Sequence, residues 1–253
     1  MLTQFQRRFL YFPDRPFVAG PADHGFVHED VELVAEDGVK LHAWWLPVAG
    51  AVRTALFLHG NAGNVSYWVE TATAFRDTGW NTLLLDYRGY GRSEGEPSEQ
   101  GTYLDARAAW LHLVRERGLD PLSIVIVGRS LGGGVATWLA EHHPAAGLVL
   151  EATFTSIADV VAHAAPLPGI RRFVRLGYPS LERMPGLDLP LLVVHGRGDT
   201  LVPFEHGRAL YDAAPEPKRF VELRGGHNDA FTMSRADYVA ALKEFDAGLS
   251  PIA

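Results

Sequence analysis

The sequence lacks cysteine altogether and has no long apolar run. Without cysteine, the chain of 253 residues can form no disulfide bond, no thiolate metal site and no cysteine nucleophile. No stretch reaches the roughly 18 apolar residues that a membrane-spanning helix needs. Residues 1–13 carry two arginines but no apolar core of the length that a secretory signal requires. We therefore expect a cytoplasmic protein without a spanning segment.

An excess of basic residues is also missing. The net charge is −7 and the pI is about 5.9, which argues against a nucleic-acid partner because such a partner requires a basic face. The histidines show no spacing with carboxylates that is typical of a metal site, so we expect neither a metal nor another cofactor. The chain contains no repeat or linker, and its length suits a single domain spanning residues 1–253. Nothing in the sequence indicates an oligomeric state.

Short apolar segments alternate with helical ones along most of the chain. Buried strands are predicted at the apolar runs 54–60, 81–86, 124–127, 146–151 and 189–196, followed by a strand at 219–223. Helices are predicted at 67–77, 101–118, 135–140, 204–213 and 230–247. The alternating segments 31–34 and 39–46 predict an antiparallel hairpin. The predicted fold class is α/β, with a mostly parallel central sheet, helices on both faces and an antiparallel N-terminal edge.

Two segments depart from this alternation. Residues 155–187 are rich in alanine, arginine and proline with weak periodicity, and we predict that they form a short helical cap inserted in the domain. Residues 4–12 mix aromatic and basic side chains. A short helix that packs its aromatic rings on the domain is the favoured interpretation, and weak association with a membrane surface is the alternative.

A tight bend is predicted at residues 128–132, which read Gly-Arg-Ser-Leu-Gly. A strand before the bend and a helix after it would leave Ser130 at the apex, with its side chain clear of the sheet. Gly128 and Gly132 lie where a side chain would collide with the opposite limb of the turn. The five-residue pattern is common by itself, so a nucleophilic role for Ser130 depends on a base and an acid elsewhere in the chain.

An acid and a base follow later strands. The functional groups of a parallel sheet gather at the carboxyl ends of its strands, and Asp199 and His227 each follow a predicted strand. The order Ser130, Asp199, His227 is the one expected when a nucleophile elbow precedes its acid and base. We therefore predict a catalytic triad in which His227 accepts the proton of Ser130 and Asp199 orients the imidazole.

Other carboxylates leave alternatives open. Asp199 could instead cap the helix that begins near Pro203. Glu151 ends the strand after the Ser130 helix and could also reach and orient His227. Arg129, inside the predicted bend, is expected to form a surface ion pair.

Two backbone N–H groups are predicted to form an oxyanion hole. Leu131 follows the candidate nucleophile at a helix start, where the helix dipole adds to its N–H. The second donor is predicted to be the N–H of Asn61, in the loop after the strand 54–60. His59 is expected to brace this loop rather than to take part in catalysis.

Substrate-pocket candidates are Tyr87 and Val202. Tyr87 belongs to the loop 86–93, which is polar and glycine-rich and is predicted to form a wall beside the site rather than core. Arg88 in the same loop is expected to pair with a neighbouring carboxylate.

Taken together, these motifs resemble the α/β-hydrolase superfamily. The resemblance rests on residues 59–64, 86–93, 95–99, 128–133, 195–199 and 226–229, and it covers the chain from about residue 31 to the last helix. The chain is most similar to the branch that includes the bud-emergence-type proteins and the abhydrolase-domain depalmitoylases. The resemblance implies Ser130, Asp199 and His227 as the triad, with Asn61 and Leu131 lining the oxyanion hole.

The expected activity is hydrolysis of a small-molecule ester or thioester through an acyl-enzyme. A short cap favours small to medium acyl groups. An acyl-protein thioesterase resembling the depalmitoylases is the nearest alternative, because it would use the same residues. A catalytically silent binding protein is the alternative from another class.

Overall fold

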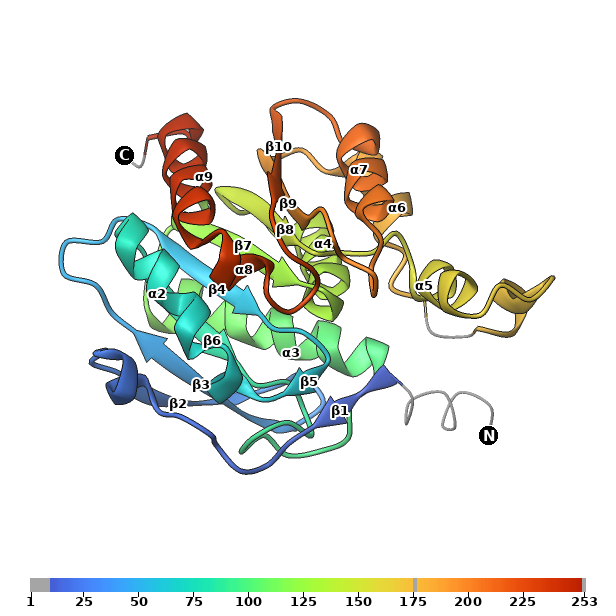
Figure 1. The fold of residues 1–253 in the computed structure, drawn as a ribbon. Helices are drawn as coiled ribbons and strands as arrows, with labels where there is room; N and C mark the ends of the chain where they lie inside the picture. The colour runs from blue at the N-terminus through green and yellow to red at the C-terminus, as the bar shows by residue number, and fades with distance from the viewer. Residues whose placement is uncertain (1–9, 175–176, 252–253) are drawn as a thin grey trace.

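The computed structural model describes residues 10–174 and 177–251. Its centre is an eight-stranded sheet in the order β10-β9-β8-β7-β4-β6-β3-β2 (Figure 1). The strands are β2 (Glu29–Val34), β3 (Lys40–Leu46), β4 (Thr54–Leu58), β6 (Asn81–Leu85), β7 (Ile124–Arg129), β8 (Gly147–Glu151), β9 (Leu191–Gly196) and β10 (Lys218–Leu223). Strand β3 runs antiparallel to both of its neighbours, and the other neighbouring pairs are parallel. The predicted mostly parallel sheet with an antiparallel N-terminal edge is confirmed.

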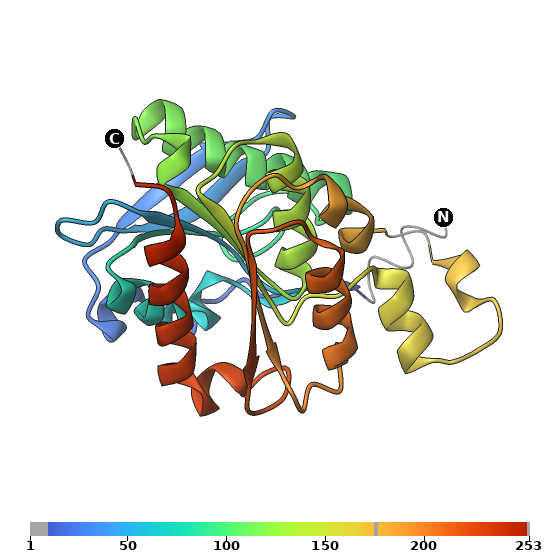
Figure 2. The ribbon, with the colours of Figure 1, turned by 90° about the horizontal axis from the view of Figure 1, so that it is seen from above.

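Helices cover both faces of this sheet (Figure 2). One face carries α3 (Glu99–Leu111), α4 (Leu131–His142) and α7 (Phe204–Ala213), and the other carries α2 (Val69–Thr78) and α9 (Arg235–Gly248). Neighbouring residues of the central strands point to opposite faces, so Leu56 packs in one core and Phe57 in the other. This two-sided burial explains why the central strands are apolar throughout.

Several short helical segments complete the fold. A π-helical turn, His112–Glu116, continues α3, and α8 (Ala230–Met233) precedes α9. The single helix predicted at 230–247 is therefore interrupted. The break lies at Ser234, whose hydroxyl accepts a hydrogen bond from the Arg224 backbone N–H (2.9 Å). Single turns of 3₁₀ helix lie at Pro21–His24, Val65–Tyr67 and Pro121–Ser123.

The segment predicted as a cap contains short helices joined by irregular residues. It contains α5 (Ile157–Ala164), the 3₁₀ turns Ile170–Phe173 and Met184–Gly186, and α6 (Ser180–Arg183). In both views α5 and the turn after it stand out from the body, at the carboxyl edge of β8 and β9 (Figures 1 and 2). The later part belongs to the core, since Tyr178 and Met184 are fully buried.

Only the end of the predicted N-terminal helix falls within the described residues, and there the structure differs from the prediction at Phe12. Residues 4–9, which carry most of the predicted aromatic-basic helix, lie outside the described residues. Phe12 lies in a strand, β1 (Phe12–Pro13), which pairs in parallel with β5 (Ala62–Gly63). Among the described residues, no helix combines the length and the apolar character that crossing a bilayer requires.

Candidate active site

Ser130 occupies the turn between β7 and α4. Its φ of 52° and ψ of −115° lie in a region that residues other than glycine rarely adopt. The turn is held by the Ser130 N–H, which donates to the Glu151 carbonyl (2.8 Å), and by the Gly133 N–H, which donates to the Ser130 carbonyl (2.9 Å). The backbone thus presents the Ser130 side chain at the carboxyl edge of the sheet.

Glycine is required on both sides of this turn. A Cβ at Gly128 would stand 2.4 Å from the carbonyl oxygen of Gly132. A Cβ at Gly132 would stand 1.9 Å from the carbonyl oxygen of Leu58, on the neighbouring strand β4. Both contacts are with backbone atoms, which cannot swing aside, so the bend forms only because these two positions lack side chains.

The structure brings the three predicted triad residues together. The Oγ of Ser130 lies 3.0 Å from Nε2 of His227, and Nδ1 of His227 lies 2.7 Å from Oδ2 of Asp199. These distances suit a neutral imidazole that donates from Nδ1 to the carboxylate and accepts the hydroxyl proton at Nε2. Asp199 follows β9, His227 follows β10 and Ser130 follows β7, so three strands supply the set at one edge of the sheet.

Asp199 is held as a carboxylate by several donors. Its Oδ1 accepts hydrogen bonds from the backbone N–H groups of Leu201 (3.0 Å) and Val202 (2.8 Å). Burial alone would raise the pKa of Asp199, but hydrogen bonding from His195 and His227 outweighs it and keeps that pKa far below its usual range. The capping alternative is not realised, since the N-cap of α7 is Pro203.

Glu151 faces Arg129 rather than the ring of His227. The two side chains form an ion pair and are each 4% exposed, which corrects the prediction that Arg129 pairs at the surface. The Glu151 carboxylate also lies 3.5 Å from the hydroxyl of Tyr238. Glu151 therefore has partners of its own, and the structure gives no support to its role as the orienting acid.

Arg129 contacts the loop that carries the candidate base, a contact that no pattern in the sequence predicts. Its Nη2 donates to the carbonyl oxygen of His227 (2.8 Å), and its guanidinium lies 4.9 Å from the ring centre of Trp68. The ion pair with Glu151 could have been inferred from the sequence. Arg129 follows one predicted strand and Glu151 ends the next, and the parallel pairing of β7 with β8 sets them opposite each other. The contact with His227 depends on the fold of a loop 98 residues away.

The two predicted oxyanion donors lie on either side of Ser130. Leu131 is the first residue of α4, and Asn61 follows β4 in a loop that passes close to Ser130, since a Cβ built on Gly60 would stand 3.7 Å from the Cβ of Ser130. Within the described part of the chain, neither backbone N–H donates a hydrogen bond. The carbonyl of Asn61 is held by the Phe12 N–H (2.9 Å) and the Tyr90 hydroxyl (2.8 Å), which fixes the loop.

A cavity of about 730 Å³ adjoins Ser130 and His227. The loop 59–64 after β4, which carries Asn61, is termed the oxyanion loop. The cavity lining comes from the N-terminal segment, the oxyanion loop and the turn after it, the bend at Ser130, and the loops after β9 and β10: Phe12, Pro13, Asp14, Gly60, Asn61, Ala62, Gly63, Tyr67, Trp68, Arg129, Ser130, Leu201, His227 and Asn228. None of these residues belongs to the segment 155–187.

The two pocket candidates, Tyr87 and Val202, are not part of this lining. Tyr87 is fully buried, and its hydroxyl donates to the His59 carbonyl (3.3 Å). Val202 is 2% exposed and packs in the core. Both predictions are wrong because these side chains turn into the core although their backbone follows a strand end.

The loop 86–93 is largely core, which also corrects its prediction. Asp86, Tyr90 and Ser93 are fully buried. Several of their polar groups bond inside the protein: Oδ1 of Asp86 accepts the Val65 N–H (2.8 Å), and the Ser93 hydroxyl donates to the Asp86 carbonyl (2.8 Å). Oδ2 of Asp86 accepts no hydrogen bond from the described residues and lies 3.5 Å from Nδ1 of His42. A polar loop can be buried when its hydrogen bonds are internal.

The predicted pairing of Arg88 is confirmed. Its guanidinium bonds to the carboxylates of Asp105 (2.8 Å) and Asp37 (2.6 Å). The prediction that His59 braces its loop agrees with its burial and with its Nδ1, which lies 2.7 Å from the Gly60 carbonyl oxygen.

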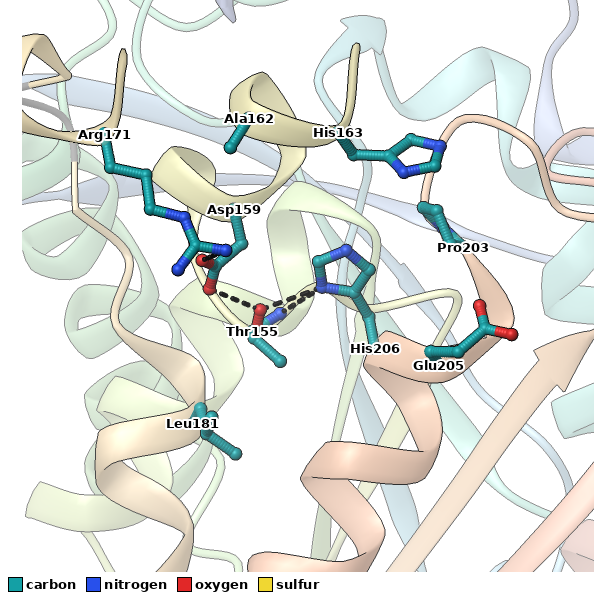
Figure 3. A pocket seen from close by; sticks show the side chains of 9 residues that line it. All are labelled: Thr155, Asp159, Ala162, His163, Arg171, Leu181, Pro203, Glu205 and His206. Carbon is teal, nitrogen blue, oxygen red and sulfur yellow. Dashed lines mark hydrogen bonds and ion pairs between the residues drawn. The ribbon is translucent and has the colours of Figure 1, made fainter. Parts of the chain in front are cut away.

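A second cavity, of about 590 Å³, lies between α5 and α7 (Figure 3). His206 accepts a hydrogen bond from the Thr155 N–H (3.2 Å), and the Thr155 hydroxyl donates to Asp159 (2.6 Å), which also pairs with Arg171 (3.0 Å). Burial lowers the pKa of His206, so the imidazole stays neutral and able to accept. These contacts tie the projecting helix to the body, and Ser130 is not in this lining.

The part of the chain that the structure describes shows no cluster of metal-ligating side chains. No group of three or more histidine, aspartate or glutamate side chains there is placed to hold a metal ion.

Comparison with known proteins gives consistent results. The family described as alpha/beta hydrolase fold matches residues 55–181. The uncharacterized protein Rv2307c of Mycobacterium tuberculosis is 40% identical, over 95% of this chain and 86% of its own length. The alpha/beta hydrolase domain-containing protein WAV2 of Arabidopsis thaliana is 35% identical, over 91% of this chain and 84% of its own. Among solved structures, the Pyrococcus furiosus esterase Pf2001 superimposes with a TM-score of 0.79, at 24% identity, over 96% of this chain and 99% of that one.

Proposed function

Because the chain belongs to the alpha/beta hydrolase fold family, we propose that it is a serine hydrolase that cleaves carboxylic esters through an acyl-enzyme. One observation carries the proposal: the continuous hydrogen-bonded series from Ser130 through His227 to Asp199, with distances of 3.0 Å and 2.7 Å. The structural similarity to a protein named as an esterase supports the same reaction class.

In the proposed reaction, Oγ of Ser130 forms a bond to the carbonyl carbon while its proton passes to Nε2 of His227. The electron pair of the carbonyl π bond moves to the oxygen, where the N–H groups of Leu131 and Asn61 stabilise the charge. The electron pair on the oxygen then re-forms the carbonyl π bond while the bond to the leaving alcohol breaks, and the alcohol oxygen takes the proton from Nε2 of His227. Water repeats these steps on the acyl-enzyme, which releases the acid and restores Ser130.

Asp199 has an electrostatic part in this scheme. Its carboxylate accepts the Nδ1–H of His227, which holds the imidazole in the tautomer with a free Nε2, and it stabilises the imidazolium that forms. The two backbone donors at Oδ1 keep the carboxylate from turning away.

The substrates proposed are esters of small to medium acyl groups. Three large apolar side chains of the cavity, Phe12, Tyr67 and Leu201, are each about half exposed, so a long acyl chain lying against them would stay in contact with water. Thioesters would use the same residues. A panel of esters and thioesters of increasing acyl length decides between this proposal and a depalmitoylase-like thioesterase, for which the rate should increase toward long chains.

The test of the reaction class is Ser130→Ala assayed with 4-nitrophenyl esters and with a fluorophosphonate probe. We expect the variant to keep its fold, to lose at least about 10⁴-fold in turnover and to take no label. Ser250→Ala is the matched control, because the Ser250 side chain is exposed and none of the hydrogen bonds found uses its hydroxyl. Full activity of Ser130→Ala would overturn the mechanism. A wild-type protein that is inert toward both esters and probe would favour the silent binding protein.

A further inference from the structure

The N-terminal segment forms one wall of the cavity that adjoins Ser130. Phe12, Pro13 and Asp14 all line it, although they lie more than a hundred residues before Ser130 in the chain. The wall faces Tyr67 and Trp68, which follow the oxyanion loop. The inference drawn here rests on the proposed ester hydrolysis and concerns which esters the site accepts.

This wall is built into the fold rather than laid on its surface. The Phe12 N–H donates to the Asn61 carbonyl and the Asp14 N–H to the Gly63 carbonyl, each at 2.9 Å. The buried side-chain amide of Asn64 donates to the carbonyl of Asp14 (3.0 Å) and to that of Pro16 (2.8 Å). Because the same loop carries the Asn61 N–H, the wall has a set position relative to the candidate oxyanion site.

The aromatic face of the cavity is also held in place. The ring of Tyr67 lies directly over Gly63, where a Cβ would stand 2.6 Å from the ring. Its hydroxyl donates to Oδ2 of Asp14 (2.9 Å), and this hydrogen bond raises the pKa of Tyr67. Phe12 and Tyr67 remain 53% and 48% exposed, so both rings have apolar surface that a bound aryl or branched alkyl group would cover.

The accessible charge of the lining is negative. Asp14 is exposed, whereas Arg129 is buried and already paired with Glu151. The neighbouring Arg15 is directed elsewhere and donates to the carbonyls of Gly91 (3.3 Å) and Ser93 (2.6 Å). A carboxylate beside two aromatic rings attracts cations, tolerates neutral groups and repels anions.

We infer that Phe12, Tyr67 and Asp14 determine substrate specificity. The site accepts esters that present a neutral or cationic aryl or branched apolar group to this wall, and it discriminates against esters that present a carboxylate or phosphate there. The described residues of the segment 155–187 contribute nothing to this selection, because none of them lines the cavity.

The experiment compares three aryl acetates that carry no charge, a negative charge or a positive charge at the meta position: phenyl acetate, 3-acetoxybenzoate and 3-(trimethylammonio)phenyl acetate. For Asp14→Asn, the kcat/KM of each ester is divided by the wild-type value for that ester, which cancels differences in intrinsic reactivity. When these ratios are divided by the ratio for phenyl acetate, we expect a value above one for the anionic ester and below one for the cationic ester. The two values should differ by about tenfold. Phe12→Ala should lower the preference for phenyl acetate over methyl acetate.

Two further measurements sharpen the result. Asp237→Asn removes the same charge from an exposed position on α9 and should leave all three ratios unchanged. For the wild type, raising the salt concentration from about 0.05 M to about 0.5 M should reduce discrimination between cation and anion, because salt screens an exposed carboxylate. This second readout needs no variant.

The outcomes separate the two proposals. If the wild type cleaves these esters but the normalised ratios of Asp14→Asn stay within about twofold of one another, the specificity wall is refuted while the reaction class stands. If the wild type cleaves none of them and the fluorophosphonate probe leaves Ser130 unmodified, the reaction class fails and the wall fails with it.

Discussion

Glu151 and Asp199 are two buried carboxylates near the candidate base, and replacing each by its isosteric amide should change a different property. Glu151→Gln should lower the stability of the protein, and Asp199→Asn should lower kcat. In Glu151→Gln, the guanidinium of Arg129 loses its ionic partner in a site where both side chains are 4% exposed. Removing one partner of a buried ion pair typically costs about 3–5 kcal/mol, because the remaining charge stays out of water. In Asp199→Asn, the imidazole of His227 loses the acceptor at 2.7 Å that selects its tautomer, and the loss in kcat should approach 10⁴-fold, the magnitude seen in a serine protease.

Two assays separate these effects. Urea unfolding measures the free energy of unfolding, and ester turnover under native conditions measures kcat. We expect Glu151→Gln to lose stability but to keep kcat within about tenfold of the wild type, because Arg129 still donates to the His227 carbonyl (2.8 Å). Asp199→Asn should lose orders of magnitude in kcat.

A double-mutant cycle checks the cause of the instability. If the cost in Glu151→Gln comes from an unpaired Arg129, adding Arg129→Gln should destabilise the protein less than the two single costs added together, with a coupling above about 1 kcal/mol. Additive costs would refute the buried pair as the cause. A larger loss of kcat in Glu151→Gln than in Asp199→Asn would move the role of orienting acid to Glu151.

Two other predictions concern the tight turn at Ser130 and the decline of the unfolding free energy at acid pH. Gly132→Ala places a Cβ 1.9 Å from the Leu58 carbonyl oxygen, so it should cost more than about 4 kcal/mol and abolish cooperative thermal unfolding; an unchanged Tm would contradict the close packing of the turn. Because the pKa of Asp199 is held below its unfolded value of about 3.9, its contribution to stability is complete above that pH and is lost as the pH falls further. Asp199→Asn should therefore flatten the decline in unfolding free energy measured by urea titration between about pH 4 and pH 2, and an unaltered decline would show that other carboxyls dominate it.

Much of the fold was predictable because its signals are local. Continuous apolar runs separated by helical patterns predict a buried parallel sheet, and the observed strands β4, β6, β7, β8 and β9 lie within one or two residues of the predicted runs. The errors lie at interruptions that depend on tertiary contacts. The long C-terminal helix breaks at Ser234, whose hydroxyl bonds to a strand end ten residues earlier.

The candidate site was predictable in type and order but not in its surroundings. The end of a strand fixes the position of the backbone but not the direction of the side chains that follow it. The sequence therefore places Tyr87 and Val202 near the carboxyl edge of the sheet but does not predict whether their side chains line the cavity or pack in the core. Burial of the loop 86–93 depends on internal partners such as the Val65 N–H for Asp86, which comes from a 3₁₀ turn 21 residues earlier in the chain. Arg129 was misplaced at the surface for the same reason.

Sequence alone determined the strand-turn-helix bend at Ser130, because a bend this tight excludes side chains at Gly128 and Gly132 and so leaves a local pattern. It also determined the order of the candidate nucleophile, acid and base, because parallel strands bring their carboxyl ends to one edge. Only the tertiary structure decided what surrounds them. The wall of Phe12 and Asp14 exists because β1 pairs with β5, some 50 residues later, through hydrogen bonds between backbone groups that every sequence possesses. Such pairing leaves no periodicity in the sequence, so the reaction type could be inferred from residues and the shape of the cavity could not.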